Sequence, residues 1–130
     1  MRLAAPTIAI VLVLAGCGGS KSGPGPVPSA TVADPAAAGK QVFASAGCAG
    51  CHQFDAAGSS GTTGPNLDTR VRPDAQDAGK PVRTFVYESI VSPNDYVAQG
   101  YPKNVMPRDF GDTLTQEQIA ELVAFVSSNV

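Results

Sequence analysis

The sequence is poor in the residues that usually build cofactor sites and protein interiors. Its 130 residues include no tryptophan, one histidine, three cysteines and two methionines, and only 6% are aromatic. Three cysteines are too few for a disulfide framework. Basic residues do not dominate either, because nine Lys and Arg face eleven Asp and Glu. A basic surface for nucleic acid is therefore not expected, and we predict no nucleic-acid partner.

A long hydrophobic segment is also missing. The apolar run from Ile8 to Leu14 is much shorter than the about 20 residues of a membrane-spanning helix. It follows Arg2 and precedes small residues, which is typical of a secretory signal. Its end, Leu14-Ala15-Gly16-Cys17, resembles the lipobox of bacterial lipoproteins. We therefore predict a signal peptide at 1–16 and lipidation of Cys17; the alternative is an ordinary signal that leaves a spare thiol.

A linker and one domain follow this signal. Residues 17–33 consist of the predicted lipidated cysteine and a stretch of Gly, Pro, Ser and other small residues, a composition typical of a flexible linker. Residues 34–130 are long enough for a single domain with one core.

The clearest helix signals lie at the two ends of this domain. Asp34 followed by Pro35 predicts a helix start, with the helix running towards residue 47. Near the C-terminus, Thr115 and Gln118 have the spacing of a capping box, which predicts a helix from residue 116. The apolar residues of this last helix recur on one face: Ile119, Leu122, Val123, Phe125 and Val126.

The middle of the domain carries weaker signals. Residues 55–81 are rich in Gly, Asp, Pro and Thr, and Leu67 and Val71 are their only large aliphatic residues, so we predict a loop that wraps an apolar cofactor. Residues 81–92 predict a short helix that ends before Pro93. No run alternates as a strand does, and the expected fold class is all-α.

The cysteines and the histidine are concentrated in one motif, Cys48-Ala49-Gly50-Cys51-His52. This spacing is typical of c-type haem attachment, in which both thiols bond to the porphyrin and the imidazole binds the iron. A structural zinc site needs four nitrogen or sulfur ligands, and the motif offers three. A thioredoxin-like redox pair expects a βαβ setting, which the sequence lacks. We therefore predict one covalent haem c.

Together these features resemble a small class I cytochrome c over about residues 34–130. Two further segments support the resemblance: the turn "GPNL", Gly64 to Leu67, and the loop "GYPKNVMP", Gly100 to Pro107. The resemblance implies that the carbonyl of Pro65 accepts a hydrogen bond from His52, which leaves Nε2 for iron. It also implies that Met106, the only methionine outside the predicted signal, is the second axial ligand, although a lone methionine is more often core filler.

The resemblance further implies three to four short helices with long loops around one haem. It also implies that the first and last helices pair, with Gly39 and Phe43 of the first meeting Leu122 and Phe125 of the last. With both axial positions filled, we expect an electron carrier and not an enzyme. The expected location is the outer face of the cell membrane, through the lipid anchor. Expected partners in a respiratory chain are a terminal oxidase, a cytochrome bc complex or a dehydrogenase. Residues 87–107 also resemble the haem domains attached to some bacterial cytochrome oxidases.

Two alternatives stay open at this point. The chain can be a fixed haem subunit of a larger dehydrogenase or oxidase complex, since the same residues would serve there. Less favoured is a ligand-binding or peroxidatic haem protein, for which Arg83 or Arg108 would have to act on the distal side. Lys103 and Arg108 flank the methionine and either steer an acidic partner or form an ordinary solvated surface.

Overall fold

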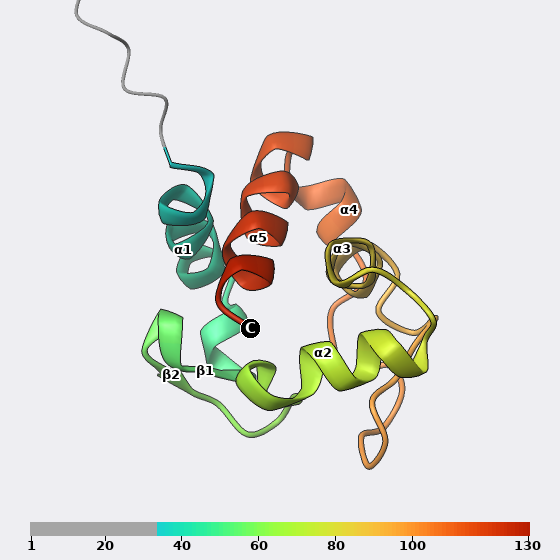
Figure 1. Cartoon of the computed structure of the whole chain (residues 1–130). Helices are drawn as coiled ribbons and strands as arrows, with labels where there is room; N and C mark the ends of the chain where they lie inside the picture. Colours follow the sequence, from blue (N-terminus) through green and yellow to red (C-terminus); the bar gives the residue numbers. More distant parts are fainter. Residues whose placement is uncertain (1–33) are drawn as a thin grey trace, which may run out of the picture. The chain divides into compact units, whose positions relative to one another are not determined.

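The computed structural model describes residues 34–130, and these residues are mainly helical (Figure 1). The predicted signal peptide 1–16, the linker 17–33 and the lipidation site Cys17 lie outside the described residues. The α-helices are α1 (Pro35–Ser45), α2 (Leu67–Asp77), α3 (Val82–Val91), α4 (Phe110–Thr113) and α5 (Gln116–Ser128). Two 3₁₀ turns, η1 (Cys48–Gly50) and η2 (Asp55–Ala57), and two short strands, β1 (Gln53–Phe54) and β2 (Ser59–Ser60), lie between α1 and α2. The all-α fold class is confirmed.

The predicted starts of the first and last helices are confirmed. The Asp34 carboxylate accepts a hydrogen bond from the Ala36 amide at 3.0 Å, and Pro35 begins α1. At α5, the Thr115 hydroxyl accepts from the Gln118 amide at 3.2 Å, while the Gln118 side chain accepts from the Thr115 amide at 2.9 Å. Both caps satisfy amides that have no partner inside the helix.

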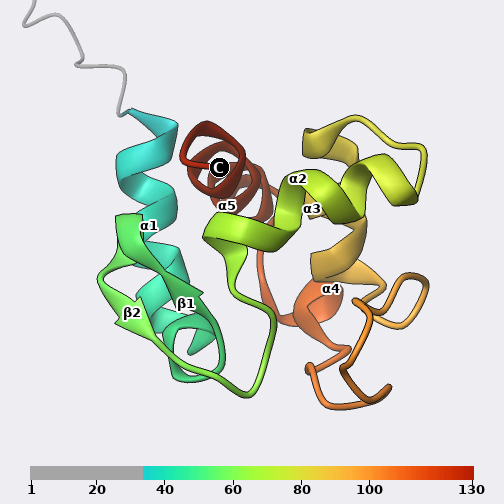
Figure 2. The ribbon, with the colours of Figure 1, turned by 60° about the horizontal axis from the view of Figure 1, so that its bottom comes forward.

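Helices α1 and α5 lie side by side (Figures 1 and 2) and approach each other closely at Gly39. A Cβ atom on Gly39 would lie 2.1 Å from the carbonyl oxygen of Glu121 and 2.6 Å from the Cβ of Phe125. No side chain fits in this space, so the crossing requires glycine. The predicted pairing of the terminal helices is therefore present in the structure.

Three aromatic rings, Phe43, Phe54 and Phe125, form a phenylalanine cluster beneath this crossing. Their ring centroids lie 5.3 to 5.8 Å apart, and both contacts of the Phe125 ring are edge to face. Phe54 is completely buried. Tilted and edge-to-face pairs at this separation contribute about 0.5 to 1.5 kcal/mol each beyond the burial of their area. The cluster joins α1, β1 and α5 into one packed unit.

The loop predicted for residues 55–81 is wrong for its second half, because α2 occupies Leu67–Asp77. Leu67, Val71 and Ala75 are spaced by four residues and therefore share a helix face; Val71 and Ala75 are buried. An ion pair between Arg70 and Asp74, one turn apart, spans 2.7 Å on this helix. Burial and this pair outweigh the loss of one backbone hydrogen bond at Pro73 inside the helix.

No strand was expected from the sequence, but residues 53–60 contain two short ones. Gln53 pairs with Ser60 and Phe54 with Ser59 in an antiparallel hairpin of two residues a strand. The Ser59 hydroxyl also donates to the His52 carbonyl at 2.9 Å. The hairpin turns the chain back beneath α1 and inserts Phe54 into the core directly after the haem motif. Alternation over two residues is too short to be recognised in a sequence.

Helix α3 matches the helix expected over residues 81–92. It ends at Val91, before Pro93, and Phe85 and Val86 are buried. An ion pair joins Lys80, just before the helix, to Glu88. Helix α3 packs against α5 on one side and α2 on the other (Figure 2). Among residues 34–130, no helix combines the length and apolar character needed to cross a membrane.

Candidate functional site

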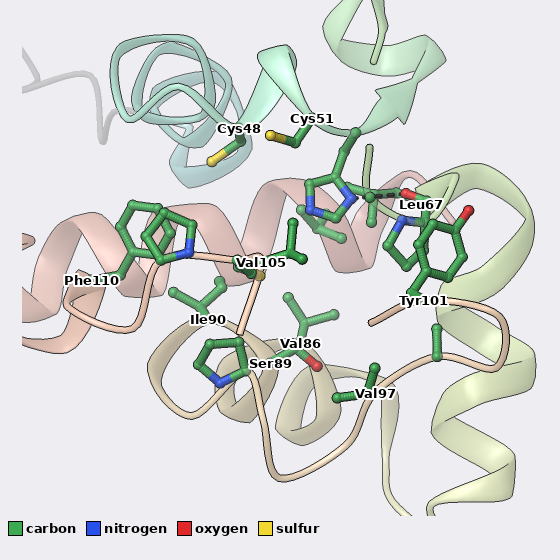
Figure 3. Close-up of a pocket in the computed structure, with 18 of the residues that line it drawn as sticks. Cys48, Cys51, Leu67, Val86, Ser89, Ile90, Val97, Tyr101, Val105 and Phe110 are labelled. Atoms are coloured by element: carbon green, nitrogen blue, oxygen red, sulfur yellow. Dashed lines mark hydrogen bonds between the residues drawn. The ribbon is translucent and has the colours of Figure 1, made fainter. Parts of the chain in front are cut away.

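A cavity of about 230 Å³ lies between η1, α2, α3, α5 and the loop that follows α3. One water molecule needs only about 10 to 15 Å³ by the same measure, so the cavity suits a group of many atoms. Figure 3 shows the sulfur atoms of Cys48 and Cys51 on one wall and Val86 and Ile90 of α3 on the facing wall. Most of the lining side chains are apolar.

The turn η1 and the residue that follows it present both cysteines to this cavity. Gly47, directly before η1, has a φ of 80°, a left-handed conformation that favours glycine. The amides of Cys51 and His52 then donate to the Cys48 carbonyl at 3.2 and 3.0 Å, which closes the turn. Burial raises the pKa of the Cys48 thiol, and the neighbouring Cys51 adds to this effect while a backbone hydrogen bond opposes it. The Cys48 thiol therefore stays protonated at neutral pH.

The imidazole of His52 is fixed from two sides. Its Nδ1–H donates to the Pro65 carbonyl at 2.8 Å, as the sequence resemblance implied. This bond assigns the proton to Nδ1 and leaves the Nε2 lone pair available to a metal. Burial lowers the pKa of His52, partly offset by the bond to Pro65, so the ring is held in its neutral, metal-binding form.

The second contact on this ring comes from Gly64, whose role the sequence did not reveal. A Cβ atom on Gly64 would lie 2.6 Å from Cε1 and 2.9 Å from Nδ1 of His52. The Gly64 amide also donates to the Cys51 carbonyl at 2.8 Å. Only glycine allows the backbone to lie this close to the imidazole. The available sequence signal was the glycine directly before Pro65.

Met106 lines the same cavity, although it lies far from the haem motif in the sequence. It lies in the loop of residues 92–109, between α3 and α4, which contains no helix or strand. The structure thus brings together all the predicted site residues of the domain around one cavity: Cys48, Cys51, His52, Pro65 and Met106.

Three further polar residues line the cavity wall, and two of them, Arg70 and Asp74, were not expected from the sequence. Asp74 is 3% exposed; Arg70 donates to its Oδ1 at 2.7 Å and the Tyr96 hydroxyl donates to the same oxygen at 3.3 Å. Burial raises the pKa of Tyr96, and the negative charges of Asp74 and Asp77 raise it further. We call Arg70, Asp74 and Tyr96 the polar triad. Its pair of Arg70 and Asp74 was missed because α2 was predicted to be a loop.

The described part of the chain was also searched for the ligands of a zinc site. Within residues 34–130, no three His, Cys, Asp or Glu side chains gather closely enough to hold a metal ion.

The sequence model of the Cytochrome c family matches residues 36–129, almost the whole described domain. The chain belongs to the cytochrome c family. A comparison with curated proteins finds no match. Cytochrome c domains carry covalently attached haem c, typically serve as electron carriers and are generally extracytoplasmic.

The cavity of this cytochrome c suits haem c. Two thiols face it from one turn, a neutral imidazole stands beside them with a free Nε2, and the walls are apolar. The close contact of Gly64 with the imidazole shows that the backbone is shaped around this ring orientation.

Proposed function

We propose that this cytochrome c is a one-electron carrier with a single haem c, bound through Cys48 and Cys51 and ligated by His52 and Met106. The observation that supports this most strongly is that these four side chains line one cavity while the Pro65 carbonyl holds Nδ1 of His52 at 2.8 Å. Bound haem supplies a one-electron iron couple, and a thioether ligand favours its reduced form.

The protein's residues have separate tasks in this function. Cys48 and Cys51 anchor the group, and Pro65 and Gly64 hold His52 in one orientation. The apolar walls exclude water, which lowers the local dielectric and favours the iron state of lower charge. His52 and Met106 would both bind the iron of the haem, and together they would leave it no free position for a substrate.

We further propose that the carrier is exported and lipid-anchored. Residues 1–16 would be removed as a signal peptide, and Cys17 would carry the lipid. The remaining linker would place the domain at a root-mean-square distance of roughly 20 to 25 Å from its anchor. Partners in a membrane-bound respiratory chain are then a terminal oxidase, a cytochrome bc complex or a dehydrogenase. The likeness of residues 87–107 to haem domains of bacterial oxidases supports this setting, either as a shuttle or as a fixed subunit.

Membrane attachment is tested by detergent partitioning. The native protein should partition into detergent, because a diacyl modification with a further amide-linked chain exceeds the two signals that stable anchoring needs. Cys17→Ser should move the protein to the aqueous phase. An unaltered protein found entirely in the aqueous phase would contradict the lipid anchor.

Nothing in the cavity favours the peroxidatic alternative. Neither Arg83 nor Arg108, the two arginines considered for a distal role, is among the residues that line it. The arginine that does line it, Arg70, is held by Asp74. An electron carrier therefore explains the cavity better.

The decisive experiment replaces Met106. The unaltered protein should bind carbon monoxide poorly when reduced and should show the weak absorption band of a sulfur-to-iron contact when oxidised. Met106→Ala should bind carbon monoxide, lose the band and have a lower reduction potential. Lys103→Ala is the control from the same loop, because Lys103 is exposed and is not among the residues that line the cavity. An unaltered protein that binds carbon monoxide readily, and that Met106→Ala leaves unchanged, would contradict the proposal.

A further inference from the structure

The segment from Pro102 to Arg108, which carries Met106, has very little to hold it in place. Within the described structure, its only hydrogen bond runs from the Asn104 amide to Oδ1 of Asn94, at 2.8 Å. Burial contributes little either, since Val105 is 47% exposed and Asn104 is exposed. Ordering each residue of such a segment costs about 1 to 2 kcal/mol of backbone entropy. This single hydrogen bond is therefore important for holding the segment in its conformation.

The backbone at Asn104 is itself unusual. Its φ of 64° is left-handed, and it is the only residue other than glycine with a positive φ among residues 34–130. Asparagine adopts this conformation more readily than most residues, but it is still disfavoured. The bond from Asn94 compensates for this cost, because it is made with the amide of the left-handed residue itself.

The bond also connects two distant parts of the loop. Asn94 lies just after α3, in a turn in which the Asp95 amide donates to the Ser92 carbonyl at 3.0 Å. Asn104 lies ten residues later and two residues before Met106. Both asparagines line the cavity. The Asn94 side chain thus ties the returning limb of the loop to the end of a packed helix.

We propose that Asn94 is a positioning residue for Met106: its side-chain carbonyl holds Asn104 in the left-handed turn that presents the thioether to the cavity. This inference rests on the proposed function, in which Met106 is an axial ligand. Asn94 acts through the backbone of the loop and touches neither the iron nor the electron partner. Its loss should loosen the sulfur contact while leaving the haem attached through Cys48 and Cys51.

The test compares Asn94→Ala with Asn94→Asp. Alanine removes the acceptor, whereas aspartate keeps a side-chain oxygen at the same reach. In Asn94→Ala, carbon monoxide affinity of the reduced protein should rise about tenfold, as the loss of one hydrogen bond would produce. The sulfur-to-iron band of the oxidised protein should fade at a lower temperature than the helix signal. Asn94→Asp should keep the band and the low carbon monoxide affinity, because its side-chain oxygen can still accept from the Asn104 amide.

A further variant separates positioning from general stability. In Asn129→Ala, a side-chain bond to the Phe125 carbonyl at 2.7 Å is lost at the end of α5, far along the chain from the loop. This variant should lose stability without gaining carbon monoxide affinity.

A measurement on the unaltered protein serves if Asn94→Ala does not fold. The Asn104 amide should exchange its hydrogen more slowly than the amides of Lys103 and Val105, which have no partner in the described structure. Exchange at equal rates would overturn the inference. So would an Asn94→Ala protein whose band and carbon monoxide affinity match those of Asn129→Ala.

Failure of the proposed function has a different signature. If the unaltered protein already lacks the sulfur-to-iron band and binds carbon monoxide readily, Met106 is not a ligand and both proposals fall. If the band is present in the unaltered protein and unaffected by Asn94→Ala, only the role of Asn94 is wrong.

Discussion

The two sides of the cavity are held in place by different means. On the side of Cys48 and His52, the chain is packed by its own side chains: α1 and α5 meet at Gly39, and the phenylalanine cluster lies beneath them. On the side of Met106, the segment from Pro102 to Arg108 contains neither helix nor strand, and in the described structure its one hydrogen bond runs from the Asn104 amide to Asn94. Burial of side chains stabilises the first side. The second side has few contacts of its own, and we expect the bound haem to stabilise it.

Because of this difference, substitutions on the two sides should have different effects. A change in the packed side should lower the free energy of global unfolding and leave the methionine contact intact while the protein is folded. A change in the loop should alter the methionine contact at little cost in global stability. Regions with few buried contacts and few hydrogen bonds are the ones that open locally.

The largest expected effect comes from the phenylalanine cluster. Phe54→Ala should lower the free energy of unfolding by about 3 to 5 kcal/mol, because it leaves a cavity where a fully buried ring stood. Denaturant titration of the haem-bound protein measures this. The sulfur-to-iron band should persist until the helices unfold. A band lost well before unfolding would show that the two sides are not independent.

Close approach of the terminal helices gives the second prediction. Gly39→Ala should cost about 1 to 3 kcal/mol or more, since the new methyl group would overlap the Glu121 carbonyl and force α1 away from α5. Gly111→Ala in α4 is the matched control, because a Cβ there meets only Val91 at 3.8 Å. Thermal unfolding of both variants should show a lower midpoint temperature for Gly39→Ala alone. Equal midpoints for the two variants would contradict the close approach of α1 and α5 at Gly39.

The polar triad gives the third prediction: replacing Arg70 should lower the free energy of unfolding more than replacing Asp74. Arg70→Met leaves the Asp74 carboxylate, whose side chain is 4% exposed, without its cation and should cost about 1 to 3 kcal/mol. Asp74→Asn should cost less, because the Arg70 side chain is 36% exposed and its charge can be solvated. Paired denaturant titrations give the order, and the reverse order would contradict the burial of Asp74.

The smallest effect concerns Tyr96 at alkaline pH. Its pKa is raised in the folded protein, above the value of about 10 of an unfolded tyrosine. The folded state therefore keeps the proton longer, and this contribution to stability is complete below about pH 10 and lost as the pH rises through the folded pKa. Tyr96→Phe should lose less stability over that range. Parallel pH curves for the two proteins would argue against the shift.

The sequence predicted the features that depend on neighbouring residues. The motif from Cys48 to His52, the caps at Asp34 and Thr115 and the apolar face of α5 each depend on spacings of five residues or fewer. The "GPNL" turn was located through family resemblance, and the bond from His52 to Pro65 agrees with it. The roles of these residues as haem ligands stay predictions.

Helix α2 shows where local pattern was insufficient. Its spacing of Leu67, Val71 and Ala75 was visible, but Pro73 and the polar composition favoured a loop. The helix forms because burial against α3 and the core offsets what Pro73 removes. Propensity is a weak prior that tertiary packing overrides.

What the sequence alone determined is the chemistry of the site: two thiols, one imidazole and one thioether in a chain with few alternatives. What only the tertiary structure decided is the orientation of these groups. Gly64 against the His52 ring, Asn94 on the Asn104 amide and Tyr96 on Asp74 join residues 10 to 22 positions apart. Such contacts depend on how the chain returns on itself, and that path is set by burial of the whole core and not by any local pattern.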